Sequence, residues 1–168
     1  MPEEIPKSTS AAADISPVAL NLLKPFQRVL HVNDSTDDQV LFQAACRKGN
    51  VPFNWHVCDC AEKGISYLQS LVDQSKKTPV CWPDLVLLDV IMPGGSGIEV
   101  LKFVRRTPEL KHLPVIIFTG QQSPEVREQA MALGANLWLI KPTDFNEMVE
   151  IAKNLYRLTG MPHPGNQN

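Results

Sequence analysis

The sequence predicts a doubly wound α/β domain, in which helices cover both faces of a parallel sheet. Three observations support this fold class. Short apolar runs alternate along the chain with segments of helical periodicity. The run "DLVLLD" at 84–89 is apolar at four consecutive positions, which is typical of a strand that is buried on both faces. Polar residues close most of the runs, as expected where the strands of such a sheet reach their functional edge.

Five apolar runs are the predicted strands. The first is "RVLHV" at 28–32 and the second is "FNWHV" at 53–57. The third is the run at 84–89, and "PVIIFT" at 114–119 repeats its pattern. "NLWLIK" at 136–141 is the fifth. Because neighbouring parallel strands need a long crossover, helices are expected in the intervals, with right-handed connections.

The intervals carry apolar residues at spacings of three and four, so five helices are predicted. We expect three of them to end at Gly49, Gly134 and Gly160, since glycine readily terminates helices. The five apolar faces consist of Val40, Leu41, Ala44 and Ala45; Ala61, Ile65, Leu68 and Val72; Ile98, Leu101 and Val104; Val126, Ala130 and Leu133; and Phe145, Met148, Val149, Ala152, Leu155 and Tyr156.

The 168 residues favour one compact domain with a tail at each end. We assign residues 28–159 to this domain. Residues 1–27, with four prolines among small and polar residues, are expected to form a flexible N-terminal extension, and residues 160–168 a C-terminal tail. Hydrophobic residues make up 43% of the chain, which is enough for a sizeable core.

Charge and cysteine content narrow the classes of partner and compartment. The net charge is −2, which argues against nucleic acid as the main partner because phosphate binding favours a basic excess. Cys46, Cys58, Cys60 and Cys81 lack the spacing of a metal or redox pair, so we expect reduced thiols in a cytoplasmic protein. The N-terminus lacks a signal-peptide pattern, and no apolar run approaches the roughly 18 residues that span a bilayer.

The polar residues that close four of the strands point to phosphoryl chemistry. Asn33 and Asp34 end the first strand, Asp89 the third, Thr119 the fourth and Lys141 the fifth. Two carboxylates on neighbouring strands suit Mg²⁺, which prefers oxygen ligands and keeps several waters. A lysine and a hydroxyl opposite the metal suit a phosphoryl group. Asp89 follows a rigid buried strand, where an aspartate can attack phosphorus and form an acyl phosphate.

Together these pieces resemble the receiver domain of two-component response regulators, over residues 28–158. The resemblance lies in the acidic end of the first strand and in three motifs that follow in the expected order and spacing: "LLDVIMPGGSG" with Asp89, Met92, Pro93 and Gly97, "FTG" with Thr119, and "LIKP" with Lys141 and Pro142. The stretch "TPELKHLPVIIFT" is similar to stand-alone regulators that include partners of phytochrome-type histidine kinases. The resemblance implies the flavodoxin-like strand order 2-1-3-4-5.

The resemblance also implies a role for each strand-end residue. Asp89 would accept the phosphoryl group from a sensor histidine kinase or a histidine phosphotransfer protein. Asp34, Asp89 and the backbone carbonyl of Ile91 would hold Mg²⁺, with Asn33 at the second acidic position, often reached through water. Lys141 would pair with Asp89 and then with a phosphate oxygen.

Two further expectations concern switching and backbone geometry. Thr119 would turn its hydroxyl to the phosphate once it arrives, and Trp138 would be the switch aromatic that follows it. The bond between Lys141 and Pro142 would be cis, which X–Pro bonds adopt at small cost.

Some of these residues also have a purely structural interpretation. "STDD" resembles a capping box in which Ser35 starts the first helix, so capping by Asp37 and Asp38 is favoured over metal binding. Trp138 could serve packing alone, as large aromatics in strands usually do. His31 lies inside the first strand, where a local hydrogen bond is favoured over catalysis. The glycines of "PGGSG" lack a P-loop lysine and are expected to let the loop bend.

Three hypotheses of function follow. The favoured one is a single-domain response regulator that is not an enzyme and signals through protein contacts, including self-association through its fourth helix, fifth strand and fifth helix. The alternative is a phosphorylation-independent receiver-like adaptor, because Asn33 removes a charge that Mg²⁺ would use. The third is a hydrolase or phosphatase of the aspartyl-phosphate type. Those enzymes usually carry a second Asp two residues after the nucleophile, where this chain has Ile91.

Overall fold

The structure is a computed structural model that describes residues 28–157. In chain order its elements are β1 (Arg28–Val32), α1 (Thr36–Lys48), β2 (Asn54–Cys58), α2 (Ala61–Ser75), β3 (Leu85–Leu88), β4 (Ile91–Met92), β5 (Gly95–Ser96), α3 (Gly97–Arg106), β6 (Val115–Thr119), α4 (Pro124–Ala132), β7 (Leu137–Ile140) and α5 (Phe145–Arg157). None of the helices described is long and apolar enough to cross a membrane. The expectations for residues 1–27, residues 160–168 and Gly160 lie outside the described residues.

Five parallel strands form one sheet in the order β2-β1-β3-β6-β7. This is the predicted order 2-1-3-4-5, because β6 and β7 are the fourth and fifth predicted strands. The labels shift since β4 and β5 form a short antiparallel hairpin, which the sequence did not predict. Gly94 adopts a φ of +74° at its turn, which glycine reaches at little cost. The expected bend of this glycine-rich loop is therefore confirmed.

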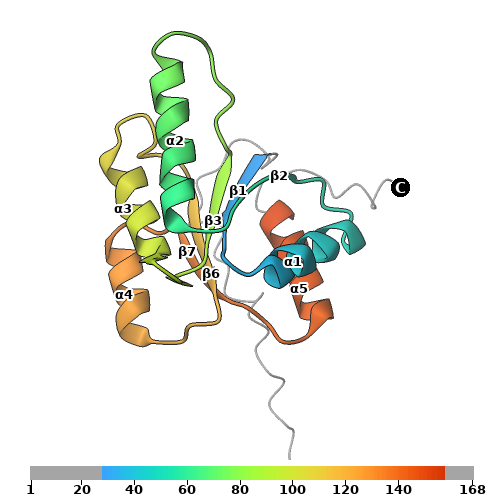
Figure 1. Cartoon of the computed structure of the whole chain (residues 1–168). Helices are drawn as coiled ribbons and strands as arrows, with labels where there is room; N and C mark the ends of the chain where they lie inside the picture. The colour runs from blue at the N-terminus through green and yellow to red at the C-terminus, as the bar shows by residue number, and fades with distance from the viewer. Residues whose placement is uncertain (1–27, 158–168) are drawn as a thin grey trace, which may run out of the picture.

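Helices cover both faces of the sheet, as Figure 1 shows: α1 and α5 lie on one side, and α2, α3 and α4 on the other. β3 is central, and all four of its side chains are fully buried. Leu85 and Leu87 pack into the core beneath α1 and α5, whereas Val86 and Leu88 pack into the core on the opposite face. The apolar run at the third strand therefore has the predicted cause, which is burial on both faces.

The helix ends follow the predicted chemistry. The Ser35 hydroxyl caps α1 by accepting a hydrogen bond from the Asp38 backbone N–H at 3.2 Å. Gly49 ends α1, and its N–H donates to the Ala45 carbonyl at 2.9 Å. Gly134 follows α4 with a φ of +99°, a conformation that favours glycine.

Arg105, near the end of α3, ties together the amino ends of β6 and β7. Its guanidinium donates to the carbonyls of Leu113 at 2.7 Å and Gly134 at 2.9 Å, and to Asn136 Oδ1 at 2.9 Å. The same Asn136 oxygen accepts from the Val115 N–H at 2.8 Å. Burial lowers the pKa of Arg105, but an arginine remains protonated. This network fixes the edge of the sheet opposite the strand ends described next.

The structure corrects two details of the sequence analysis. The second strand lies at Asn54–Cys58, one residue later than predicted. The bond between Lys141 and Pro142 is trans, because no cis peptide occurs among the described residues. Trans is also the intrinsic preference of X–Pro bonds.

Candidate functional site

Five predicted site residues meet at the carboxyl edge of the sheet. Asn33 and Asp34 follow β1, Asp89 follows β3, Thr119 ends β6 and Lys141 follows β7. Because β1, β3, β6 and β7 are consecutive neighbours in the sheet, their ends form one row. The pairing of Val32 with Leu88 in the register of β1 and β3 sets Asn33 beside Asp89. The predicted convergence of these strand ends is therefore present in the structure.

The Asp89 carboxylate is held through both of its oxygens. The Thr119 hydroxyl donates to Oδ1 at 2.8 Å, and the Lys141 ammonium donates to Oδ2 at 2.5 Å. The Ile91 backbone N–H reaches Oδ1 at 3.3 Å. The Asp89 side chain is only 11% exposed, so these contacts act in a partly desolvated site, where charged hydrogen bonds are strong.

Thr119 is buried at the end of β6, and its hydroxyl already points at Asp89. The same oxygen accepts from the Gln121 N–H at 3.2 Å, which leaves the hydroxyl proton for the carboxylate. The Thr119 hydroxyl therefore lies against the proposed acceptor carboxylate. The expectation that this hydroxyl turns to a phosphate once it arrives stays a prediction.

The acidic side of the site suits a hard cation. Asp34 is exposed, and its carboxylate has no partner within residues 28–157. A carboxylate has about four acceptor positions, so Asp89 retains capacity beyond its bonds to Thr119 and Lys141. The described residues contain no group of three or more His, Cys, Asp or Glu placed to hold a metal. Binding of Mg²⁺ by two carboxylates, a backbone carbonyl and water stays a prediction, which rests on the preference of this cation for oxygen ligands.

Asn33 is fully buried, and its hydrogen bonds fix how its amide is turned. The Ser35 N–H donates to Asn33 Oδ1 at 2.9 Å. Since an N–H must meet an acceptor, the remaining atom is the nitrogen Nδ2, which has no partner among the residues described. The oxygen keeps one acceptor position. The role of Asn33 at the metal, through water, stays a prediction.

Asp38 belongs to the site, although the sequence analysis assigned it to capping. Its backbone N–H does take part in the cap, but its carboxylate Oδ2 lies 2.6 Å from Lys141 Nζ. Asp37, in the same turn, is exposed and has no partner in the part of the chain described. The "STDD" pattern could not distinguish Asp38 from Asp37. Only Asp38 contacts Lys141, and this contact depends on where the fifth parallel strand ends.

Trp138 lies on the same face of the sheet as Thr119. It pairs with Ile117, and Thr119 pairs with Ile140 two positions further along the same ladder. Its side chain is half-buried against the core beneath α2, α3 and α4. This position permits both interpretations of Trp138, packing and switching.

His31 lies in β1 within an aromatic cluster. Its ring centroid is 6.1 Å from that of Phe42 and 5.8 Å from that of Trp55. It is fully buried, and Nδ1 has no hydrogen-bond partner among the described residues, so the expected local hydrogen bond is not found. Burial, with the charge of Lys141, lowers its pKa to about 4. His31 is therefore neutral near pH 7.

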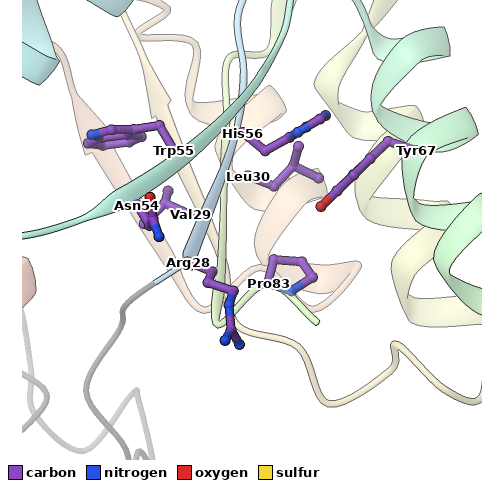
Figure 2. A pocket seen from close by; sticks show the side chains of 8 residues that line it. All are labelled: Arg28, Val29, Leu30, Asn54, Trp55, His56, Tyr67 and Pro83. Atoms are coloured by element: carbon purple, nitrogen blue, oxygen red, sulfur yellow. The ribbon is translucent and has the colours of Figure 1, made fainter. Parts of the chain in front are cut away.

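A hollow of about 240 Å³ lies at the other end of the sheet, beside the amino ends of β1 and β2. In Figure 2, Arg28 and Pro83 lie at its outer end and His56 and Tyr67 on one side. The His56 and Tyr67 rings stack with centroids 3.7 Å apart. None of the predicted site residues lines it, so it is separate from the strand-end site.

A model of the response regulator receiver domain matches residues 29–153. The chain belongs to this family. Receiver domains of response regulators are signalling proteins and not enzymes, which agrees with the favoured hypothesis. The family therefore argues against the third hypothesis, a hydrolase of the aspartyl-phosphate type. The phosphate regulon transcriptional regulatory protein PhoB of Escherichia coli K12 is 37% identical over 76 residues, which are 45% of this chain and 33% of PhoB. The chain thus spans about a third of the length of that relative.

Solved response regulators share the fold of this receiver domain. The phosphorylated cyanobacterial phytochrome response regulator RcpA has a TM-score of 0.69 at 23% identity, covering 83% of this chain and 99% of RcpA. The Mn²⁺-bound form of the response regulator Rcp1 has a TM-score of 0.67 at 22% identity, covering 82% and 99% of the two chains. At these identities the likeness shows the fold alone.

Proposed function

We propose that this receiver domain accepts a phosphoryl group on Asp89 from a sensor histidine kinase or a histidine phosphotransfer protein. The observation that carries the proposal is the placement of one buried carboxylate between a hydroxyl and an ammonium, Thr119 and Lys141. An Asp89 oxygen attacks the phosphorus of the phosphohistidine. The P–N bond then breaks, its electrons and a proton remain with the imidazole, and an acyl phosphate forms on Asp89.

The surrounding side chains stabilise the transferring group. Lys141 moves its donors from Asp89 Oδ2 to a phosphoryl oxygen, and the Thr119 hydroxyl donates to another. Asp34, Asp89, the Ile91 carbonyl and Asn33 (through water) are the residues that would hold Mg²⁺. When bound, this cation supplies positive charge that offsets the charge of the transferring oxygens. The Mn²⁺ in Rcp1 supports a divalent cation here.

We further propose that phosphorylation shifts the conformation of a surface that contacts other proteins. Thr119 and Trp138 share one face of the sheet, and Trp138 is half-buried, so a pull on Thr119 can change how Trp138 packs. The face formed by α4, β7 and α5 is the surface that would respond, through a partner or a second copy. The four free cysteines support a reducing compartment such as the cytoplasm.

A small phosphodonor with Mg²⁺ tests the proposal, with intact mass as the readout. The wild type is expected to gain one phosphoryl group, and Asp89→Asn none. Asp73→Asn, which changes an exposed acid on α2, is the matched control and should be phosphorylated like the wild type. A wild type that gains no mass, or an Asp89→Asn variant that gains the same mass, contradicts phosphorylation at Asp89.

The phosphorylation-independent adaptor remains the second candidate, because Asn33 leaves the metal side of the site with one carboxylate fewer. It predicts that partner binding is the same with and without phosphodonor. A pull-down of the cognate kinase or effector by wild type and Asp89→Asn separates the two. Loss of phosphodonor-dependent binding in Asp89→Asn favours the regulator, and unchanged binding favours the adaptor.

A further inference from the structure

The Lys141 ammonium lies between two carboxylates that come from different elements. Its Nζ is 2.5 Å from Asp89 Oδ2, beyond β3, and 2.6 Å from Asp38 Oδ2, in the first turn of α1. The Lys141 side chain is 14% exposed, whereas that of Asp38 is 40% exposed. Asp38 is therefore the more exposed of the two carboxylates that pair with this lysine.

The position of Asp38 is set by a chain of hydrogen bonds from β1 to α1. Asn33 Oδ1 accepts from the Ser35 N–H, and the Ser35 hydroxyl accepts from the Asp38 N–H. Gln39 Nε2 donates to the Asn33 carbonyl at 2.5 Å. The turn that carries Asp38 is thus tied to the strand end beside Asp89.

We infer that Asp38 is a positioning residue for Lys141. This inference rests on the proposed function, because it concerns how the lysine changes partners during phosphoryl transfer. A lysine ammonium has three donors on a flexible stem. When it leaves Asp89 Oδ2 for a phosphoryl oxygen, the bond to Asp38 keeps it from turning into solvent. Holding a catalytic group in place before the reaction contributes to its rate.

The charges of the site support the same assignment. Asn33 replaces a carboxylate on the metal side, and Asp38 adds one on the lysine side. Asp38 and Asp89 are the two carboxylates that contact the Lys141 ammonium. Asp38 therefore restrains Lys141 from α1, an element other than the one that leads to Asp89.

The first test measures how well Lys141 is protected, in the absence of metal and phosphodonor. An amine-specific reagent is applied to the folded protein, and labelling of Lys141 is quantified by peptide mass spectrometry. Asp38→Asn should raise the labelling rate about two- to fivefold, the range expected for a partly exposed ion pair. Asp37→Asn removes the same charge from the same turn without touching Lys141, and should leave the rate unchanged. Equal labelling in wild type and Asp38→Asn would overturn the inference.

The second test uses phosphorylation at saturating phosphodonor and Mg²⁺. Asp38→Asn should slow it about two- to fivefold, while Asp37→Asn should not. In a Lys141→Met background, Asp38→Asn should add no further loss, because its effect passes through the lysine. An undiminished loss in that background would overturn the positioning role. If the wild type is not phosphorylated at all, the proposed function fails, and the labelling experiment still decides whether Asp38 holds Lys141.

Discussion

Asn33 places an amide at a strand end where an acid would give a cation more charge. Its oxygen binds the Ser35 N–H, and its nitrogen is buried without a partner in residues 28–157. An unpaired buried donor costs stability, so the position serves something other than packing. A carboxylate there could keep the bond to Ser35 with one oxygen and offer the other to Mg²⁺.

Asn33→Asp is therefore expected to tighten Mg²⁺ binding about tenfold or more. One added charge about 4 Å from a divalent cation is worth about 2 kcal/mol even at the dielectric of water, which is more than tenfold in affinity. Titration calorimetry on both proteins gives the two dissociation constants. Asn54→Asp adds the same charge at the start of β2, far from the site, and should leave the affinity unchanged. Equal affinities for wild type and Asn33→Asp would show that position 33 does not face the cation.

The sequence predicted which residues gather at the strand ends, because a parallel sheet brings the ends of its neighbouring strands together. Asp89, Thr119 and Lys141 are in contact for that reason. Asp38 was missed since its side chain crosses from α1 to the end of β7, a contact that no local pattern contains. The sequence also did not predict that the Asn33 side-chain nitrogen lacks a partner among the described residues, because this depends on the Ser35 N–H donating to the side-chain oxygen of Asn33.

The hairpin of β4 and β5 is an element that the sequence pattern did not predict. Long apolar runs and helical periodicity predicted five strands and five helices, with bounds that shift by a residue or so. Strands of two residues are too short to give a pattern. Yet this hairpin carries Ile91 and leads into α3 through Gly97, directly beside Asp89. The Gly97 N–H donates to the Val90 carbonyl at 3.2 Å.

Gly97→Ala should distort the loop that carries Asp89. A Cβ at Gly97 would lie 1.9 Å from the Asp89 carbonyl oxygen, so the backbone must move. We expect a loss of about 1–3 kcal/mol in the free energy of unfolding, the range for overpacked sites, with slower phosphorylation of the folded fraction. Denaturant unfolding and intact mass after phosphodonor treatment measure the two effects.

Gly95→Ala is the control for this substitution, because its nearest neighbour would be Ala61 Cβ at 3.4 Å, an ordinary contact. It should leave both stability and phosphorylation close to wild type. If Gly97→Ala behaves in the same way, the close approach of α3 to the acceptor loop is not required for the site.

At the scale of the whole molecule, β1 carries a titratable group into the core. His31 is neutral near pH 7 because burial holds its pKa at about 4, below the unfolded value of 6.5. Between these values the unfolded chain binds a proton that the folded domain excludes. The domain should therefore lose stability as the pH falls from about 6.5 towards 4, by up to about 3 kcal/mol.

Urea unfolding from pH 7 to 4.5 in metal-free buffer tests this pH dependence. Carboxyl groups begin to titrate at the lower end of this window, so the contribution of His31 is the difference between the wild-type and variant curves. His31→Leu, which has similar size and no polar atom, should remove most of the slope between pH 6.5 and 4.5. His56→Leu, at an exposed position on the next strand, should retain it. Parallel curves for wild type and His31→Leu would exclude His31 as the source.

The ion pair between Lys141 and Asp38 joins residues that are 103 positions apart. A contact of such separation costs loop-closure entropy, because the chain must close a long loop before the contact gains any free energy. A chain folded only through β6 would contain the Asp89 carboxylate and the Thr119 hydroxyl but not the Lys141 ammonium, which follows β7. During synthesis the two contacts that hold the Asp89 carboxylate, from Thr119 and Lys141, would therefore be completed only after β7 has joined the sheet.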